Sequence, residues 1–236
     1  GEGLLLQPKT KPVANIIALP DADQHPEQLA GLLPGIPAGS QFARHLAENG
    51  FQVLIPVVIS RTFLFPGKTQ QQTYREWIYR QAFHMGRHII GYEVQKVLSA
   101  VDWFKTGESK DLEIGIIAYN EGALIAFYAA AVDKRIDATL VSGYFNSRQR
   151  VWEEPIYRNV WRLLSEFGDA EIASLIAPRH LIIEHSSIPE IIEKAESVEK
   201  LPAVGGLPYT GYKGRLQTPP FSSVKAEYNR IDELTK

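Results

Sequence analysis

The chain contains no cysteine at all among its 236 residues. This absence excludes disulfides, thiolate metal sites and a cysteine nucleophile, so any chemistry has to use other side chains. It does not identify the cellular compartment, and the localisation stays open.

The sequence also lacks a strong charge of either sign and lacks long apolar runs. Its net charge is −2, and no basic stretch is interleaved with aromatic residues in the manner of a nucleic-acid site. No apolar run approaches the roughly 20 residues that a membrane-spanning helix needs. We therefore expect neither a nucleic-acid partner nor a membrane span.

What is present is ordinary for a globular domain: 44% of the residues are hydrophobic and 22% are charged. Strands are expected at residues 4–6, 14–19, 51–59, 112–118, 138–144 and 180–185. Helices are expected at residues 40–48 with Ser40 as N-cap, 73–104, 124–131, 160–167, 170–175, 191–200 and from about 222. This alternation predicts an α/β fold with a doubly wound, mostly parallel sheet.

One turn within this pattern stands out. The apolar run 112–118 enters a tight turn, Ala118-Tyr119-Asn120-Glu121-Gly122, and a helix pattern follows. In α/β-hydrolases this strand–turn–helix carries G-x-S-x-G with the nucleophilic serine at the tip, and the next backbone N–H helps to form an oxyanion hole. Here the tip is Asn120, whose amide cannot be deprotonated to attack a carbonyl. A plain βα turn of a Rossmann-like fold is the alternative interpretation.

An acid and a base would have to accompany the turn. Glu184 or Glu190 lies near the expected position of the acid, after the strand at 180–185. No histidine follows His185, which comes too early for the usual base, and we expect it to order a loop or pack in the core. Glu121 is ionisable and adjacent to the tip, so it is a candidate general base that could activate water.

Two histidines form a separate motif. His84 and His88 are spaced as H-x-x-x-H on an expected helix, which would put both rings on one face as in zinc proteases. Met85 stands where the catalytic glutamate of such proteases is expected. A metal site is thus the weaker alternative, hydrogen-bonded or interfacial histidines are the favoured interpretation, and no cofactor is predicted.

The remaining charged residues are expected to be structural. Asp21 and Asp23 follow the strand at 14–19 and are interpreted as a solvated acidic loop, since carboxylates would repel an oxyanion. Arg87 has apolar neighbours and is expected to anchor a buried carboxylate or backbone carbonyls. Helix-surface or inter-element ion pairs are expected among Arg75, Glu76, Arg80, Glu93 and Lys96.

Neither an internal repeat nor a linker is visible, so residues 1–236 are interpreted as a single domain. The aromatic and charged stretch that begins at residue 146 lies where α/β-hydrolases place a lid, and we interpret about 146–176 as a lid-like insertion. A small hydrophobic cluster beneath a long loop is the favoured interpretation of its aromatic residues. Residues 190–236 form an atypical C-terminal segment. Because the chain begins at Gly1 without a methionine, we expect it to be part of a longer protein.

The linear order of several short motifs resembles the acetyl xylan esterase and dienelactone hydrolase-like branch of the α/β-hydrolases. The matching stretches are Gly86-Arg87, Gly91, residues 94–104, the turn at Asn120, and residues 130–138, 141–145 and 177–185. The resemblance covers roughly residues 12–190 and implies the three-layer α/β-hydrolase sandwich. It places the family's serine at Asn120 and its acid near His185–Glu190, and it leaves the family's histidine without a counterpart.

Three functions follow as hypotheses. The first is a hydrolase-fold domain without triad catalysis, which binds a small-molecule or carbohydrate ligand, a protein partner or further domains of the same protein. The second is an active carboxylic-ester hydrolase that deacetylates acylated sugars by an unconventional site. The third is the metal site at His84 and His88.

Overall fold

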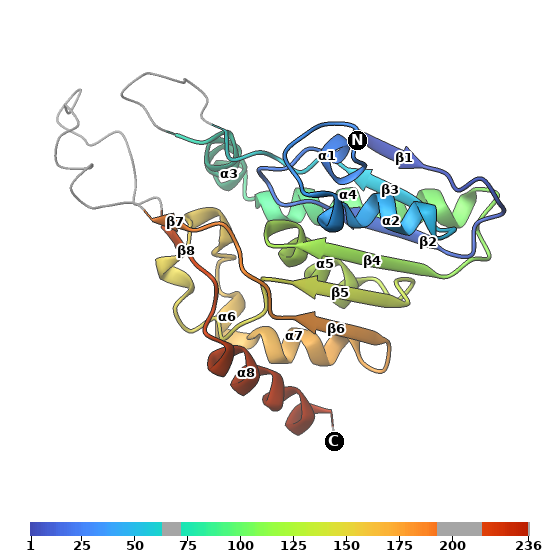
Figure 1. Ribbon diagram of the computed structural model, residues 1–236. Coiled ribbons are helices and arrows are strands. Elements are labelled where there is room, and N and C mark those ends of the chain that lie inside the picture. The colour runs from blue at the N-terminus through green and yellow to red at the C-terminus, as the bar shows by residue number, and fades with distance from the viewer. Residues whose placement is uncertain (63–71, 193–213, 236) are drawn as a thin grey trace.

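The computed structural model describes residues 1–62, 72–192 and 214–235, and its main feature is a six-stranded sheet (Figure 1). The strand order is β1-β3-β2-β4-β5-β6, in which β1 pairs antiparallel with β3 and the other pairs are parallel. These strands are β1 (Gly3–Leu6), β2 (Asn15–Leu19), β3 (Gln52–Pro56), β4 (Ile114–Tyr119), β5 (Ala138–Ser142) and β6 (His180–Glu184). The prediction of an α/β fold with a mostly parallel sheet is therefore confirmed.

Helices lie on both faces of this sheet. They are α1 (Pro26–Leu29), α2 (Phe42–Glu48), α3 (Tyr74–His84), α4 (Ile89–Thr106), α5 (Glu121–Val132), α6 (Leu163–Glu166), α7 (Asp169–Ile176) and α8 (Phe221–Leu234). Single 3₁₀ turns are η1 (Ala38–Ser40), η2 (Val151–Glu153) and η3 (Ile156–Arg158), and a small antiparallel ladder joins β7 (Ile191–Ile192) and β8 (Arg215–Leu216). None of the helices in these described ranges has the length and apolarity needed to cross a membrane.

The main core lies between the sheet and a layer formed by α4, α5 and α7 (Figure 1). Helix α5 is apolar nearly all round, as its run of Ala, Leu, Ile and Phe requires, and a helix of that composition is stable only when it is buried. Phe127 at its centre is fully buried against Tyr144 and Phe145. Helix α8 packs on α7 outside this layer. The central position of α5 holds the turn before it, at Asn120, in the interior of the molecule.

The opposite face of the sheet is covered only in part. Helices α1 and α2 pack over β1, β3 and β2, where Leu29, Ala43 and Val53 form a second, smaller core. Over β5 and β6 the described residues place no helix, and Ile182 at the centre of β6 is 57% exposed. One face of the sheet is thus covered by helices from β3 across to β6. The other face is covered over β1, β3 and β2 and exposed over β5 and β6.

The long helix expected over 73–104 is two helices. Helix α3 ends at His84, α4 begins at Ile89, and Gly86 between them has φ 68°. This left-handed conformation is easy for glycine and ends the helix there. Gly91 lies within α4, where a Cβ would meet no atom within 4 Å, so this glycine marks neither a kink nor a close contact.

Two other local predictions differ from the structure. Ser40 does not cap α2, because it ends the 3₁₀ turn η1 and Gln41 stands at the N-cap without a side-chain hydrogen bond. The helix expected at 191–200 does not begin at Ile191, since Ile191 and Ile192 form β7. Residues 193–200 of that expected helix lie outside the described residues.

Candidate functional site

The turn that joins β4 to α5 consists of Asn120 alone, with backbone torsions φ 48° and ψ −107°. Asparagine tolerates positive φ better than most residues, and the conformation costs on the order of 1–3 kcal/mol. Gly122 follows at a close approach of two segments, because a Cβ there would clash with the carbonyl oxygens of Leu19 and Pro20. The glycine lets the first turn of α5 pack against the end of β2. This packing sets Asn120 beside the loop that follows β2.

The side chain of Asn120 is covered by the protein itself. The residue is 1% exposed, and its Oδ1 accepts a hydrogen bond from Arg158 Nη2 at 2.8 Å. Arg158 belongs to η3 and is itself buried. A ligand could therefore reach the tip of the turn only after Arg158 moved away.

Glu121, the first residue of α5, is fully buried among three guanidinium groups. Its carboxylate accepts from Arg61 Nη2 at 2.9 Å, from Arg75 Nη2 at 3.1 Å and from Arg158 Nε at 3.0 Å. Burial alone would raise the pKa of Glu121, but the guanidiniums of Arg158, Arg75 and Arg61 outweigh it and hold this pKa well below its usual range. Glu121 is therefore a permanent anion that is a poor acceptor of a proton from water.

Asp21 accepts a hydrogen bond from the backbone N–H of Glu121, the donor next to the tip of the turn. It lies in the loop after β2, is 1% exposed, and accepts from Arg61 Nη1 and Nη2 at 3.0 Å each. Its Oδ1 also accepts from the backbone N–H of Glu121 at 3.2 Å. The expectation of a solvated acidic loop is thus wrong for Asp21, because the arginine draws it inward. It is correct for Asp23, whose side chain is 46% exposed although it pairs with Arg61.

These contacts belong to one buried cluster, which we call the arginine–carboxylate network. Its members are the three arginines Arg61, Arg75 and Arg158 and the three carboxylates Asp21, Glu93 and Glu121. Positive and negative charges are equal in number among these six buried residues, and the less buried Asp23 and Glu154 add ion pairs to Arg61 and Arg158 at the rim. Buried charges persist only when they are paired in this way.

The far side of the network is equally well connected. Arg75 on α3 donates to both carboxylate oxygens of Glu93 on α4, at 2.8 and 2.6 Å, and to Ile59 O at 3.0 Å. Tyr157 accepts from Arg61 Nε at 3.1 Å, and its ring lies 5.0 Å from the guanidinium carbon of Arg75. The network therefore joins α3, α4, α5 and η3 to the loops that follow β2 and β3.

A comparison with models of known protein families identifies the family of this chain. The sequence profile of the dienelactone hydrolase family matches residues 33–155, which is just over half of the chain. The chain belongs to the dienelactone hydrolase family. No curated protein matches it by sequence.

Solved structures agree with the family's fold. A protein described as a candidate acetyl xylan esterase from Bacteroides fragilis has a TM-score of 0.64 at 18% identity, covering 79% of this chain and 55% of that one. The methylesterase BT1017 has a TM-score of 0.50 at 15% identity, with 77% and 38% covered. A glucuronoyl esterase from Solibacter usitatus has a TM-score of 0.45 at 14% identity, with 77% and 58% covered. The chain thus spans between 38% and 58% of the length of these structures, and the likeness to the first two shows that it shares their fold.

The residues expected near the family's acid and base lie at the surface. Glu190 is exposed, and His185, also exposed, has its Nε2 2.8 Å from Pro219 O and its ring edge-on to Phe221. His185 therefore orders the segment before α8, as expected of it. Glu184 at the end of β6 accepts from Ser142 Oγ at 2.5 Å. No hydrogen bond within the described ranges links Glu184, His185 or Glu190 to Asn120.

The two histidines of the H-x-x-x-H motif do not share a helix. His84 ends α3, and His88 is the N-cap of α4, where its Nδ1 accepts from the Ile90 N–H at 3.2 Å. Its Nε2 lies 3.2 Å from Asn159 O, so the neutral ring carries its proton there, and burial lowers the pKa of His88. The expectation of one helix face is wrong, because the break at Gly86 separates the two rings. The parts of the chain that the structure describes contain no group of three metal-ligating side chains.

The sequence pointed to some arginines of the network and missed others. The Arg75–Glu93 and Arg80–Glu76 ion pairs are present as expected. Arg87, however, is exposed, and the expectation that it anchors a buried carboxylate is wrong. Nothing in the local sequence distinguishes Arg61 and Arg158 from surface arginines. Each is more than 35 positions from the turn along the chain, and only the tertiary structure shows that it contacts the turn.

Proposed function

We propose that this chain is a hydrolase-fold domain that no longer performs triad catalysis and serves as a non-catalytic binding or structural domain. One observation carries the proposal: the side chain of Asn120 and the backbone N–H of Glu121 are both bound by the protein's own charged side chains. These are the two groups that a hydrolase of this fold uses as nucleophile and as oxyanion donor.

The chemistry of each group supports the proposal. An amide at the tip provides no nucleophile. The carboxylate of Asp21 on the Glu121 N–H would repel the developing oxyanion that this donor should stabilise. Glu121, the candidate general base, is held as an anion by three arginines and has no exposed surface from which to activate water.

The alternative is an active carboxylic-ester hydrolase that deacetylates acylated sugars. Its support is the family membership together with the fold shared with the candidate acetyl xylan esterase. Such an enzyme would need Arg158 and Asp21 to leave the turn before a substrate could bind. The buried ion pairs of both residues oppose that movement.

An ester-hydrolysis assay distinguishes the two proposals. The purified chain, its Asn120→Ala and Asn120→Ser variants and an exposed control, Glu166→Gln, are each given 4-nitrophenyl acetate and acetylated xylan. We expect all four proteins to match the rate of buffer within about twofold, because the turn lacks a nucleophile and its oxyanion donor is occupied. Thermal unfolding followed by circular dichroism verifies that each variant is folded.

Two results would contradict the non-catalytic proposal. Turnover at least tenfold above buffer in the parent chain, lost in folded Asn120→Ala and retained in Glu166→Gln, would establish catalysis at the turn. A gain of activity in Asn120→Ser would mean that a base still acts on position 120.

A further inference from the structure

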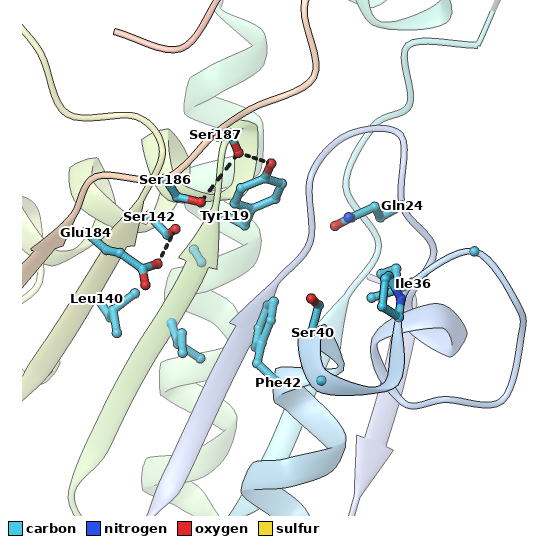
Figure 2. A pocket seen from close by; sticks show the side chains of 15 residues that line it. Gln24, Ile36, Ser40, Phe42, Tyr119, Leu140, Ser142, Glu184, Ser186 and Ser187 are labelled. Atoms are coloured by element: carbon cyan, nitrogen blue, oxygen red, sulfur yellow. Dashed lines mark hydrogen bonds between the residues drawn. The ribbon is translucent and has the colours of Figure 1, made fainter. Parts of the chain in front are cut away.

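A hollow lies on the open face of the sheet. It is a cleft of about 580 Å³ between the carboxyl ends of β4, β5 and β6 and the loop that contains η1. Figure 2 shows Tyr119, Ser142 and Glu184 on the strand side, and Gln24, Ile36 and Ser40 on the loop side. Its volume falls within the range of about 300–1,000 Å³ that is typical of small-molecule sites.

The electrostatics of this cleft are simple. Glu184 is the one charged side chain among its described lining residues, which include no lysine, arginine or histidine. Its Oε2 accepts from Ser142 Oγ at 2.5 Å, and no ion pair to Glu184 is formed within the described part of the chain. The cleft therefore presents a net negative charge. Such a site repels anions and favours a ligand that brings a positive charge.

The remaining lining residues suit an amine with an apolar body. Phe42, Leu140 and Ile117 contribute apolar surface, and Tyr119 contributes a second aromatic ring. The Tyr119 hydroxyl donates to Ser187 O at 2.6 Å, which fixes its ring at the rim of the cleft (Figure 2). Aromatic rings attract cations through their π faces, and a carboxylate makes a charge-assisted hydrogen bond to an ammonium group.

We propose that this cleft binds a small organic monocation, namely an ammonium group attached to an apolar or aromatic body, with Glu184 as its counter-ion. The ammonium group contacts Oε1 of Glu184, the oxygen that does not accept from Ser142, and the body lies against the apolar floor formed by Phe42, Leu140 and Ile117. The site is distinct from the turn at Asn120, so the proposal holds whether or not that turn is catalytic.

Isothermal titration with three matched probes tests the proposal at pH 7.5. Benzylamine carries the positive charge, benzyl alcohol is its neutral counterpart, and benzoate carries the opposite charge. We expect benzylamine to bind at least tenfold more tightly than benzyl alcohol, and benzoate not to bind. A charge-assisted hydrogen bond of about 1.5–3 kcal/mol corresponds to roughly a tenfold to hundredfold effect.

Two variants locate the binding. Glu184→Gln keeps an acceptor for Ser142 and removes the charge, and it should reduce benzylamine affinity at least tenfold. Glu166→Gln, on the exposed end of α6, is the matched control and should leave the affinity unchanged. Ser40→Lys introduces a competing cation on the opposite wall and should also abolish binding, and the fold of each variant is verified by thermal unfolding.

Three outcomes would overturn the proposal. One is equal binding of benzylamine and benzyl alcohol, and another is benzylamine binding that survives Glu184→Gln. The third is binding of an uncharged saccharide such as xylobiose that is tighter than that of benzylamine and insensitive to Glu184→Gln. None of these measurements involves ester hydrolysis, so their failure is separate from a failure of the proposed non-catalytic role.

Discussion

Tyr119 and Asn120 are neighbours at the end of β4, yet they lie in two regions with opposite electrostatics. Asn120 is buried and bound to Arg158 within the arginine–carboxylate network. Tyr119 lines an open cleft in which Glu184, the one charged side chain among the described lining residues, accepts from the Ser142 hydroxyl (Figure 2). Two glutamates thus stand at the same edge of the sheet: Glu121 is enclosed by three guanidiniums, and Glu184 faces solvent.

This contrast indicates which of the two regions can bind a charged ligand. In a low-dielectric interior each charge must be paired, and the network satisfies that requirement with its own side chains. Charges that neutralise one another leave little attraction for a ligand. A carboxylate at the surface can instead remain unpaired at low cost, because water solvates it, and it is available to a cation.

Replacing glutamate by glutamine in each of the two regions should give the largest difference in the free energy of unfolding. Glu121→Gln leaves three buried arginines with only two fully buried carboxylates, Asp21 and Glu93, and we expect a loss of about 3–5 kcal/mol in the free energy of unfolding. Glu184→Gln should change that free energy by less than about 0.5 kcal/mol, as surface substitutions do. Urea unfolding measures both. Equal losses in the two variants would break the comparison.

The second prediction compares two buried carboxylates, Glu121 and Asp169, by the pH dependence of the stability that each contributes. Asp169 lies on the covered face of the sheet. Burial raises the pKa of Asp169 to about 7 against the opposing Arg148 guanidinium and Asn146 N–H. Its Oδ1 has no hydrogen-bond partner among the residues that the structure describes. The folded state therefore retains a proton that the unfolded chain releases near pH 4. Stability from this group is fully present below that pH and is lost as the pH rises through about 7.

Asp169→Asn removes this titration and should be more stable than the parent chain at pH 8, by at most about 4 kcal/mol. The difference in unfolding free energy between the two proteins, measured from pH 5 to pH 8, isolates Asp169 from the histidines that both contain. A difference that stays constant over this range would contradict the assignment. Glu121 has its pKa shifted the other way, so it contributes stability that is lost only in acid, outside this window.

The smallest effect concerns the turn that separates the two regions. Gly122→Ala would push a Cβ against the backbone carbonyls of Leu19 and Pro20, and we expect a loss of about 1–3 kcal/mol. Gly91→Ala is the same substitution within α4, where the Cβ meets nothing, and it should stabilise by about 0.5–1 kcal/mol. Thermal unfolding gives the sign of each change. A neutral Gly122→Ala would mean that α5 does not depend on its close approach to β2.

The fold could be predicted from local patterns, and the contacts of the site could not. Apolar runs and helical spacing correctly indicated the strands and α5, because burial of the hydrophobic face decides these elements. The H-x-x-x-H interpretation failed at Gly86, where a positive φ ended the helix. Asp21 resembled any acid in a loop, and its burial depends on Arg61, which is 40 positions away.

The alternation of strands and helices and the position of Asn120 at the tip of the turn between β4 and α5 can both be read from the amino-acid sequence. These features follow from side-chain periodicity and from the chemistry of one residue type, which act over a few positions. Folding alone brings Arg158 and Asp21 to that turn and places Glu184, with Ser142 as its hydrogen-bond donor, in a cleft whose other described lining residues are uncharged. Charge pairing acts between residues that are close in space, and only folding brings together residues that are 37 and 100 positions apart.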